Sequence, residues 1–384
     1  MDLWSRAKQI IPQGNQLLSK RSEIYPAYYS VANGVNVWDL QGNKYIDMSI
    51  MGVGTCILGY ADAYVNLKVI QGISQGSMST LNCPEEVELA ELLLELHKWA
   101  GMVRFARTGG EAMAIAVRIA RAYTNKDKIA FCGYHGWHDW YLAANLEDKT
   151  NLDIHLLPDL ECAGVPKCLK GSVIPFEFNN LEQLEEIVEK HNDIGAIIIE
   201  PMRHEWPSFY ILARIRDIAY RIGAVLIFDE ITIGWRLHLG GSHLLFGVNP
   251  DIAVFGKAMS NGYPMSAIIG KKYIMEAVNK TFISSTYWTE RIGSIAALET
   301  IKRMKEINLP RYLEDLGMDL KIGLEDLGFE VKPPNAFLKI EMNDLDSFKK
   351  RMLKKGYLAG NQIYLSYAHT QEIIDNYLEV VKNL

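Results

Sequence analysis

Two short apolar runs of the sequence each end at residues that could do chemistry. Residues 225–228 are followed by Asp229 and Glu230, and residues 252–255 are followed, after one glycine, by Lys257. Neither run alternates between apolar and polar residues, which is typical of strands buried on both faces of a parallel sheet. Because ligands of open α/β sheets bind beyond the carboxyl ends of the strands, the acid and the amine predict one shared site.

A glycine turn follows a further expected strand. Residues 102–106 predict this strand, residues 112–123 predict a helix, and Thr108-Gly109-Gly110-Glu111 joins the two. Such a turn brings free backbone N–H groups and the positive end of the helix dipole to one point, which can bind phosphate. Most strand-to-helix turns bind no ligand, so the turn alone leaves both interpretations open.

Imidazole and aromatic side chains cluster after the strand expected at residues 128–133. His135, His138 and Asp139 are of the types that bind zinc or iron. Their spacing is not specific for a metal, however, and histidines beside aromatic residues are more often packed and hydrogen-bonded. Tyr134 offers a third interpretation, a flat face on which a planar ring can stack.

A further acid, Glu200, follows the strand expected at residues 194–199. It adds a carboxylate to the sheet edge at which Asp229 is expected. With His135, these two acids form an alternative, metal-dependent site, which predicts sensitivity to chelators. Arg203 is able to pair with a carboxylate or phosphate of a substrate or to form a structural ion pair, and the sequence leaves both open.

Apolar strands and amphipathic helices alternate between about residues 85 and 275. This alternation predicts an α/β fold with a mainly parallel sheet covered on both faces. Residues 35–46 predict a hairpin, and short strands alternate with helices after residue 317, which is typical of a smaller α+β lobe. We expect three segments: an N-terminal part of the small lobe (1–45), a large cofactor-binding domain (46–285) and a C-terminal small domain (286–384).

The composition favours a protein that acts on small molecules. The chain has 384 residues, of which 49% are hydrophobic, enough for a large domain and a smaller one. Its net charge of −6 gives no electrostatic reason to expect nucleic acid or an anionic membrane as partner. The five cysteines include no C-x-x-C pair, and the sequence shows neither a signal peptide nor a long apolar span. We therefore expect a cytoplasmic location.

Pyridoxal phosphate requires a combination of parts that this chain offers. The cofactor needs a lysine for a Schiff base, an acid for the pyridinium proton, an anion site and a stacking partner. Lys257, Asp229, the Gly109-Gly110 turn and Tyr134 are of these types, and Glu200 is expected beside them. Most single Asp and Lys residues lie on surfaces or in ion pairs, so it is the ordered combination that favours this cofactor and no metal.

The chain resembles the class III, pyridoxal-phosphate-dependent aminotransferases of fold type I, and within them the glutamate-1-semialdehyde 2,1-aminomutase-like group. The resemblance covers nearly the whole length and is carried by VNVWDLQGNKYIDM, CPEEVELAELL, RTGGEAMAIAVRIARAYT, YHGWHD, IIIEPMR, AVLIFDEITIGWR, PDIAVFGKAMSNGYPMSAIIGK and LSYAHTQEIID. It implies a large domain with a mainly parallel sheet of the seven-stranded type and a small lobe built from both termini.

The resemblance also implies roles for single residues. Lys257 matches the Schiff-base lysine, and Asp229 matches the partner of the pyridinium nitrogen. Ile231 occupies the apolar position on one face of the cofactor ring, and Tyr134 the aromatic position on the other face.

Three further positions concern the phosphate. Gly109 and Gly110 match the phosphate loop, although the family usually has Ser-Gly-Thr where this chain has Thr108-Gly109-Gly110. Thr286 matches a threonine that reaches the phosphate from the neighbouring subunit. The resemblance therefore implies a homodimer with shared active sites.

Two departures from the family bear on the substrate. The common Gly-Asn-Pro is replaced by Thr289-Glu290-Arg291, and the aminomutase segment Pro-Ser-x-Phe-Glu is reduced to Ala359-Gly360-Asn361, so the acid that closes over the aminomutase substrate has no counterpart. These losses favour transfer of an amino group from an amino-acid donor, glutamate, to an aldehyde or keto acceptor, in sugar or surface-polysaccharide biosynthesis. The alternatives are an intramolecular aminomutase and a non-enzymatic protein of the same fold.

Overall fold

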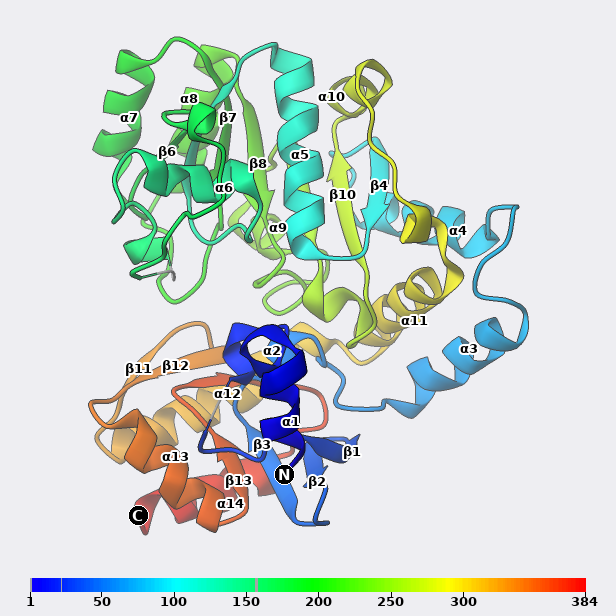
Figure 1. The fold of residues 1–384 in the computed structure, drawn as a ribbon, viewed down its shortest axis with the longest axis vertical. Helices are drawn as coiled ribbons and strands as arrows, with labels where there is room; N and C mark the ends of the chain where they lie inside the picture. The colour runs from blue at the N-terminus through cyan, green and yellow to red at the C-terminus, as the bar shows by residue number, and fades with distance from the viewer. Residues whose placement is uncertain (1, 22, 156–157) are drawn as a thin grey trace. The chain divides into compact units, whose positions relative to one another are not determined.

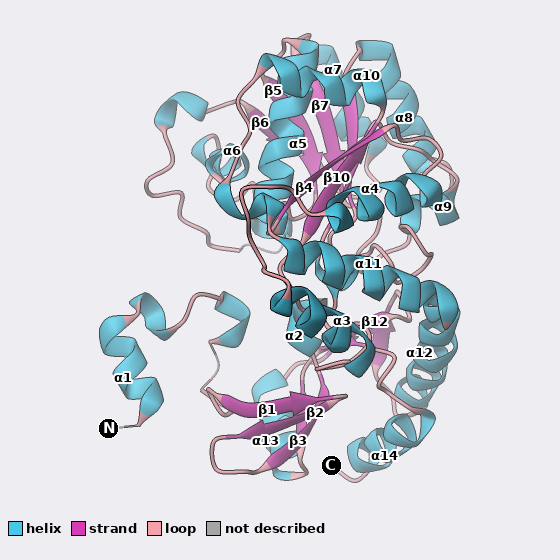
Figure 2. Cartoon of the chain, turned by 90° about the vertical axis from the view of Figure 1, so that its right-hand side faces the viewer, coloured by secondary structure: helices cyan, strands magenta, loops and turns pink. Residues whose placement is uncertain are grey.

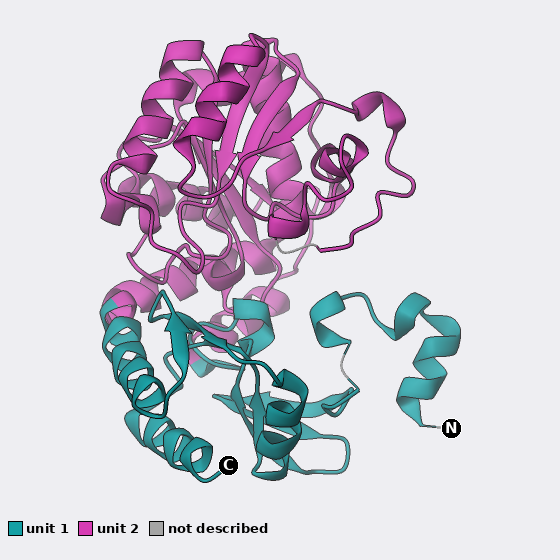
Figure 3. Ribbon diagram, turned by 90° about the vertical axis from the view of Figure 1, so that its left-hand side faces the viewer, with its two compact units in different colours: residues 1–63, 311–384 teal, residues 64–310 magenta. Residues whose placement is uncertain are grey.

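The chain forms two compact units in the computed structural model, which describes residues 2–21, 23–155 and 158–384. The larger unit comprises residues 64–310, and the smaller unit comprises residues 1–63 together with 311–384 (Figure 3). The smaller unit is therefore built from both ends of the chain. The lobe boundaries expected after residues 45 and 285 stay a prediction.

A seven-stranded sheet forms the centre of the larger unit (Figure 1). Its order is β4 (Met102–Ala106), β10 (Ser266–Gly270), β9 (Ile252–Phe255), β8 (Val225–Asp229), β7 (Ile194–Ile199), β5 (Lys128–Cys132) and β6 (Val173–Pro175). The pairings from β9 to β6 are all parallel, whereas β10 is antiparallel to both of its neighbours. The expected mainly parallel sheet is confirmed, with β10 as the strand that breaks the pattern.

Helices cover both faces of this sheet (Figures 1 and 2). On one face, α5 packs against residues such as Ile227 and Val254, and on the other α8 packs against residues such as Leu226 and Phe228. The larger unit's helices are α3 (Ala63–Ser74), α4 (Pro84–Leu96), α5 (Gly109–Thr124), α6 (Asp139–Leu142), α7 (Leu181–Lys190), α8 (Ile211–Ile222), α9 (Ser242–Phe246), α10 (Lys272–Met275) and α11 (Arg291–Glu306). Burial on both faces explains the unbroken apolar runs of the central strands.

The register of the central strands brings the predicted site residues to one edge. Asp229 pairs with Val254 of β9, and the backbone N–H of Glu230 donates to the Val254 carbonyl at 2.9 Å. On the other side, the N–H of Glu200 donates to the carbonyl of Cys132 at 3.1 Å. The ladder therefore continues just past the strand ends and holds these carboxylate-bearing residues in fixed positions.

The smaller unit contains two sheets. One has the order β1 (Tyr29–Asn33), β2 (Asn36–Asp39), β3 (Lys44–Met48) and β13 (Tyr357–Ala359), and the other β11 (Glu330–Lys332), β12 (Phe337–Glu341) and β14 (Gln362–Tyr364). β2 and β3 form the expected antiparallel hairpin. The helices are α1 (Leu3–Ile10), α2 (Met51–Gly54), α12 (Leu309–Asp326), α13 (Leu345–Lys354) and α14 (Gln371–Lys382).

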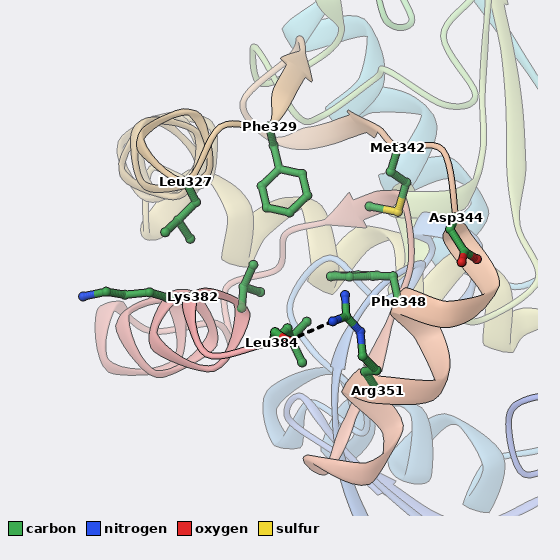
Figure 4. Close-up of a pocket in the computed structure, with 9 residues that line it drawn as sticks. Leu327, Phe329, Met342, Asp344, Phe348, Arg351, Lys382 and Leu384 are labelled. Atoms are coloured by element: carbon green, nitrogen blue, oxygen red, sulfur yellow. Dashed lines mark hydrogen bonds between the residues drawn. The ribbon is translucent and has the colours of Figure 1, made fainter.

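A cavity of about 350 Å³ lies in the smaller unit, between α12, α13 and α14 (Figure 4). Apolar side chains such as Phe329 and Phe348 line it, and Arg351 Nη1 donates to the Leu384 carbonyl at 2.8 Å beside it. Its lining includes none of the residues that the sequence predicts for the site.

Across residues 2–21, 23–155 and 158–384, no helix is both long enough and apolar enough to span a bilayer.

Candidate active site

Lys257 begins the 3-10 turn η6 (Lys257–Ser260), directly after β9 and Gly256. Its φ is 42°, in the left-handed region that side chains other than glycine rarely adopt, and strained backbone of this kind clusters at functional sites. The Nζ atom donates to Thr232 Oγ1 at 2.8 Å. Burial and the nearby Arg203 guanidinium lower the pKa of Lys257 to about 7, so much of this amine is neutral and nucleophilic near neutral pH.

Arg203 forms an ion pair with Glu200 at the end of β7. The Arg203 Nε atom lies 3.0 Å from Glu200 Oε2, and Nη2 donates to Thr232 Oγ1 at 3.1 Å. Of the two roles left open for Arg203, the structural ion pair is present. Burial acts to raise the pKa of Glu200, but the adjacent Arg203 charge outweighs it and the pKa is lowered, so Glu200 stays ionised.

Asp229, the last residue of β8, is paired with His135. Asp229 Oδ2 lies 2.8 Å from His135 Nδ1, and Oδ1 accepts a hydrogen bond from the Ile231 N–H at 3.0 Å. His135 Nε2 lies 3.1 Å from the Cys132 carbonyl, which can only accept. Burial raises the pKa of Asp229, whereas the His135 hydrogen bond acts in the opposite direction and favours the carboxylate.

The structure gives no support to a metal centre at these residues. Within the described ranges, no three His, Cys, Asp or Glu side chains are placed to hold an ion. His135 is engaged with Asp229, while Glu200 is engaged with Arg203. Both metal hypotheses therefore lack the geometry that they need.

The expected phosphate turn lies at the N-terminus of α5. Thr108 caps the helix, and the Glu111 carboxylate accepts hydrogen bonds from the Thr108 and Arg107 N–H groups at 3.0 and 3.2 Å. This capping box leaves the N–H groups of the first turn, at Gly109 and Gly110, directed out of the helix end. Such a group of donors suits a phosphate.

Ile231 links this turn to the lysine. A Cβ atom added to Gly109 would lie 3.0 Å from Ile231 Cδ1, and one added to Gly256 would lie 3.5 Å from Ile231 Cγ2. The half-buried Ile231 side chain therefore lies between the α5 turn and the residue that precedes Lys257. This position agrees with an apolar support for a ring held between the two.

Tyr134 follows β5, at the same edge of the sheet as Glu200 and Asp229. Its N–H donates to Glu200 Oε2 at 2.9 Å, and its ring contacts Tyr141 edge-on with 6.1 Å between centroids. Gly133 precedes it with a φ of 114°, and a Cβ there would lie 2.8 Å from Glu200 Oε2. Glycine is needed at this point so that the Tyr134 backbone can approach Glu200.

Thr286 begins the exposed turn η8 (Thr286–Thr289). The three residues that depart from the family follow it. Glu290 caps α11 through the Ile292 and Gly293 N–H groups, and it forms an ion pair with Arg107 at 3.0 Å. Glu290, one of the residues that depart from the family, therefore links the start of α11 to Arg107, which directly precedes the N-cap of α5.

Two residues of the candidate site, Thr232 and His135, were not assigned these contacts from the sequence. Thr232 gave no signal, because a threonine after an acid pair has no distinctive pattern. His135 was considered only as a metal ligand or a packed side chain, and its contact with Asp229 depends on the β5 and β8 ends lying near one another.

Together, these groups fit pyridoxal phosphate. Lys257 supplies an amine with a lowered pKa, Asp229 a buried acid, and the α5 turn a cradle in which a Cβ at Gly109 would meet Ile231. These are the parts that the cofactor requires.

Comparison with known proteins identifies the family. Residues 18–373 match the family model for class III aminotransferases. The chain is 30% identical to a 3-aminobutyryl-CoA aminotransferase of Cloacimonas acidaminovorans (strain Evry), covering 100% of this chain and 95% of that protein. It is 32% identical to a glutamate-1-semialdehyde 2,1-aminomutase of Sulfurihydrogenibium azorense (strain DSM 15241 / OCM 825 / Az-Fu1), covering 92% and 90%.

A solved structure agrees with this result. A PLP form of the FumI protein of Sphingopyxis sp. MTA144 superimposes with a TM-score of 0.89 at 25% identity, covering 100% of this chain and 94% of that one. The chain belongs to the class III aminotransferases. It is a pyridoxal-phosphate-dependent transaminase, as the motif resemblance implied.

Proposed function

We propose that this transaminase moves an amino group from glutamate to an aldehyde or keto acceptor, with Lys257 and Asp229 as its catalytic residues. The observation that carries the assignment is the Lys257 amine, whose pKa is lowered to about 7 and whose Nζ lies 2.8 Å from Thr232 Oγ1. A neutral amine can both attack an aldehyde and later accept or return a proton.

The proposal gives each residue at this sheet edge a task. Bound pyridoxal phosphate supplies a ring that accepts the electrons left when a Cα–H bond breaks. Lys257 holds the cofactor and moves the proton, and Asp229, supported by His135, keeps the ring nitrogen protonated. Ile231 and Tyr134 support the two ring faces, and Glu200 fixes the backbone of Tyr134.

The remaining tasks concern the phosphate and the partner subunit. In the proposal, the N–H groups of Gly109 and Gly110 bind the phosphate at the α5 N-terminus. Thr286 of a second copy of the chain reaches the same group, which is consistent with its exposure at the start of η8. The active species is accordingly a homodimer, and we expect it in the cytoplasm.

A short connection in the smaller unit favours transfer of the amino group between two substrates over its transfer within one substrate. β13 ends at Ala359 and β14 begins at Gln362, so only Gly360 and Asn361 join the strands. Neither carries the acid expected to close over an aminomutase substrate. A role in sugar or surface-polysaccharide biosynthesis remains the expected setting. The aminomutase function stays the second candidate, because relatives such as the S. azorense protein bear that name.

Single-turnover measurements test the proposal. Loaded enzyme mixed with glutamate should release one equivalent of 2-oxoglutarate per site and lose the visible absorbance of the lysine-bound cofactor. Conversion of glutamate 1-semialdehyde without any donor, and no keto acid from glutamate, would instead establish the aminomutase. Lys257→Ala should lack the visible absorbance and turn over neither substrate, and retained absorbance would contradict the role of Lys257.

A further inference from the structure

His138 occupies the space that a side chain at position 110 would need. A Cβ atom added to Gly110 would lie 2.9 Å from both Cε1 and Nδ1 of His138, and 3.5 Å from Trp137 Nε1. Cβ contacts below 3.0 Å essentially do not occur, so any side chain at position 110 would displace the imidazole. The glycine of the α5 turn and the ring of His138 are therefore complementary in shape.

The loop that carries His138 is held tightly against the helix end. A Cβ added to Gly136, whose φ is 103°, would lie 3.1 Å from the Gly110 Cα atom, so the two backbones are in close contact. The His138 carbonyl accepts hydrogen bonds from the Tyr141 and Leu142 N–H groups at 2.9 and 3.1 Å. The backbone of His138 is thus fixed while its ring faces the first turn of α5.

One polar atom of this ring has no hydrogen-bond partner. His138 Nδ1 is buried, and among the described residues no group is placed to bond to it. The neighbouring Glu111 carboxylate already accepts hydrogen bonds from the Thr108 and Arg107 N–H groups. A buried polar atom without a partner is unfavourable, so a bound water, ion or ligand that supplies a partner would be stabilising.

We infer that His138 is a further cofactor-binding residue, whose Nδ1–H donates to the phosphate of pyridoxal phosphate at the first turn of α5. It replaces the hydroxyl that a serine or threonine at position 110 would supply. The inference rests on the proposed position of the phosphate at Gly109 and Gly110. It explains together why position 110 is glycine and why a buried imidazole nitrogen faces that position.

The electrostatic surroundings agree with a neutral donor. Burial lowers the pKa of His138, although the Glu111 and Asp139 carboxylates act in the opposite direction. A neutral imidazole has one N–H group, and the Nδ1–H form would use it on the phosphate. Trp137 Nε1 lies near the same point but belongs to an exposed side chain, which makes Trp137→Phe a suitable control.

The test compares pyridoxal phosphate with pyridoxal, which lacks the phosphate. Apoenzyme of the full chain is titrated with each ligand, and the dissociation constants are read from the absorbance of the bound ligand. His138→Ala should weaken pyridoxal phosphate about tenfold or more, as expected for a hydrogen bond to a charged group, and change pyridoxal less than about twofold. His138→Asn, which keeps an N–H near the Nδ1 position, should retain most of the preference for the phosphorylated ligand, and Trp137→Phe nearly all of it.

A double variant tests whether a side chain at position 110 and the His138 imidazole compete for the same space. Gly110→Ser alone should weaken binding because its Cβ meets His138, whereas Gly110→Ser combined with His138→Ala should bind pyridoxal phosphate more tightly than His138→Ala alone. Equal losses for both ligands in His138→Ala, or no loss for either, would overturn the inference. If His138→Ala does not fold, as judged by circular dichroism, His138→Asn and the double variant decide the question.

The same titrations separate the inference from the proposed function. If the unmodified apoenzyme does not prefer pyridoxal phosphate over pyridoxal, the phosphate position at Gly109 and Gly110 fails, and the inference with it. If the unmodified enzyme has this preference and His138→Ala keeps it in full, only the role of His138 fails. In both cases, the role of Lys257 is judged independently from Lys257→Ala.

Discussion

Thr232 and Lys257 are joined by a 2.8 Å hydrogen bond from Nζ to the threonine Oγ1, and the same oxygen accepts the Arg203 Nη2 donor at 3.1 Å. A hydroxyl oxygen has two lone pairs, so it can serve both donors. The guanidinium is therefore held close to the amine, and its charge is one of the causes of the lowered Lys257 pKa. Glu200 also binds this guanidinium, with 3.0 Å between Arg203 Nε and Glu200 Oε2.

Replacement of Arg203 should raise the pKa of Lys257. Arg203→Met removes a positive charge that favours the neutral amine and leaves the Glu200 carboxylate, which favours the ammonium form, without its partner. Since only the neutral amine attacks an aldehyde, the rate at which apoenzyme captures pyridoxal phosphate should rise through pH of about 7 in the unmodified protein. In Arg203→Met, the midpoint should move up by about one pH unit. Arg203→Lys keeps the charge and should shift it less, and a downward shift in Arg203→Met would contradict this account.

Replacement of His135 should move the acid limb of the turnover profile upward. Burial raises the pKa of Asp229, and the His135 hydrogen bond opposes that effect. In the proposed function, Asp229 supports catalysis only as a carboxylate, which is present above its pKa and lost as the pH falls through it. His135→Phe keeps a ring but no donor, so kcat should fall at a higher pH than in the unmodified enzyme. His135→Asn, which can still donate, is the control, and unchanged profiles would show that His135 does not act on Asp229.

Shared active sites can be tested by mixing inactive subunits. Lys257→Ala should have no activity, and Thr286→Ala should bind the cofactor about tenfold more weakly if its hydroxyl meets the phosphate. In a mixed dimer, one of the two sites combines Lys257 of one chain with Thr286 of the other, so activity at limiting cofactor should reappear when the variants are unfolded and refolded together. Light scattering gives the oligomeric state. Activity no higher than that of Thr286→Ala alone would mean that each site is complete within one subunit.

Glu290, which replaces a residue of the family's Gly-Asn-Pro segment, should contribute to the stability of the fold. Glu290 caps α11 and pairs with Arg107, and both side chains are largely buried, at 18% and 10% exposure. Glu290→Ala should lower the free energy of unfolding by about 1–3 kcal/mol, since it removes a cap and leaves a buried charge. Glu290→Gln keeps a capping oxygen and should cost less. Glu306→Ala, at an exposed pair with Arg303, should change the value by under about 0.5 kcal/mol, and denaturant unfolding measures all three.

The central strands and the start of α5 could be predicted because the pattern of apolar residues in the sequence indicates which segments are buried. The apolar runs that end at Asp229 and before Lys257 predicted β8 and β9, and the glycine turn predicted the start of α5. The contacts of Thr232 and His138 could not be predicted, because each depends on two loops meeting across the sheet edge. The antiparallel direction of β10 could not be predicted for a similar reason, since an apolar run indicates burial but neither the direction of the strand nor its neighbours.

The left-handed backbone conformation of Lys257 lowers the stability of the protein. A residue with a Cβ atom at a φ of 42° costs roughly 1–2 kcal/mol, whereas glycine adopts this conformation freely. Lys257→Gly should therefore give an apoenzyme that is as heat-resistant as the unmodified apoenzyme or more so, and that has no activity. Selection for thermostability alone would favour glycine at position 257, and the proposed role of Lys257 in the chemistry explains why a lysine is found there.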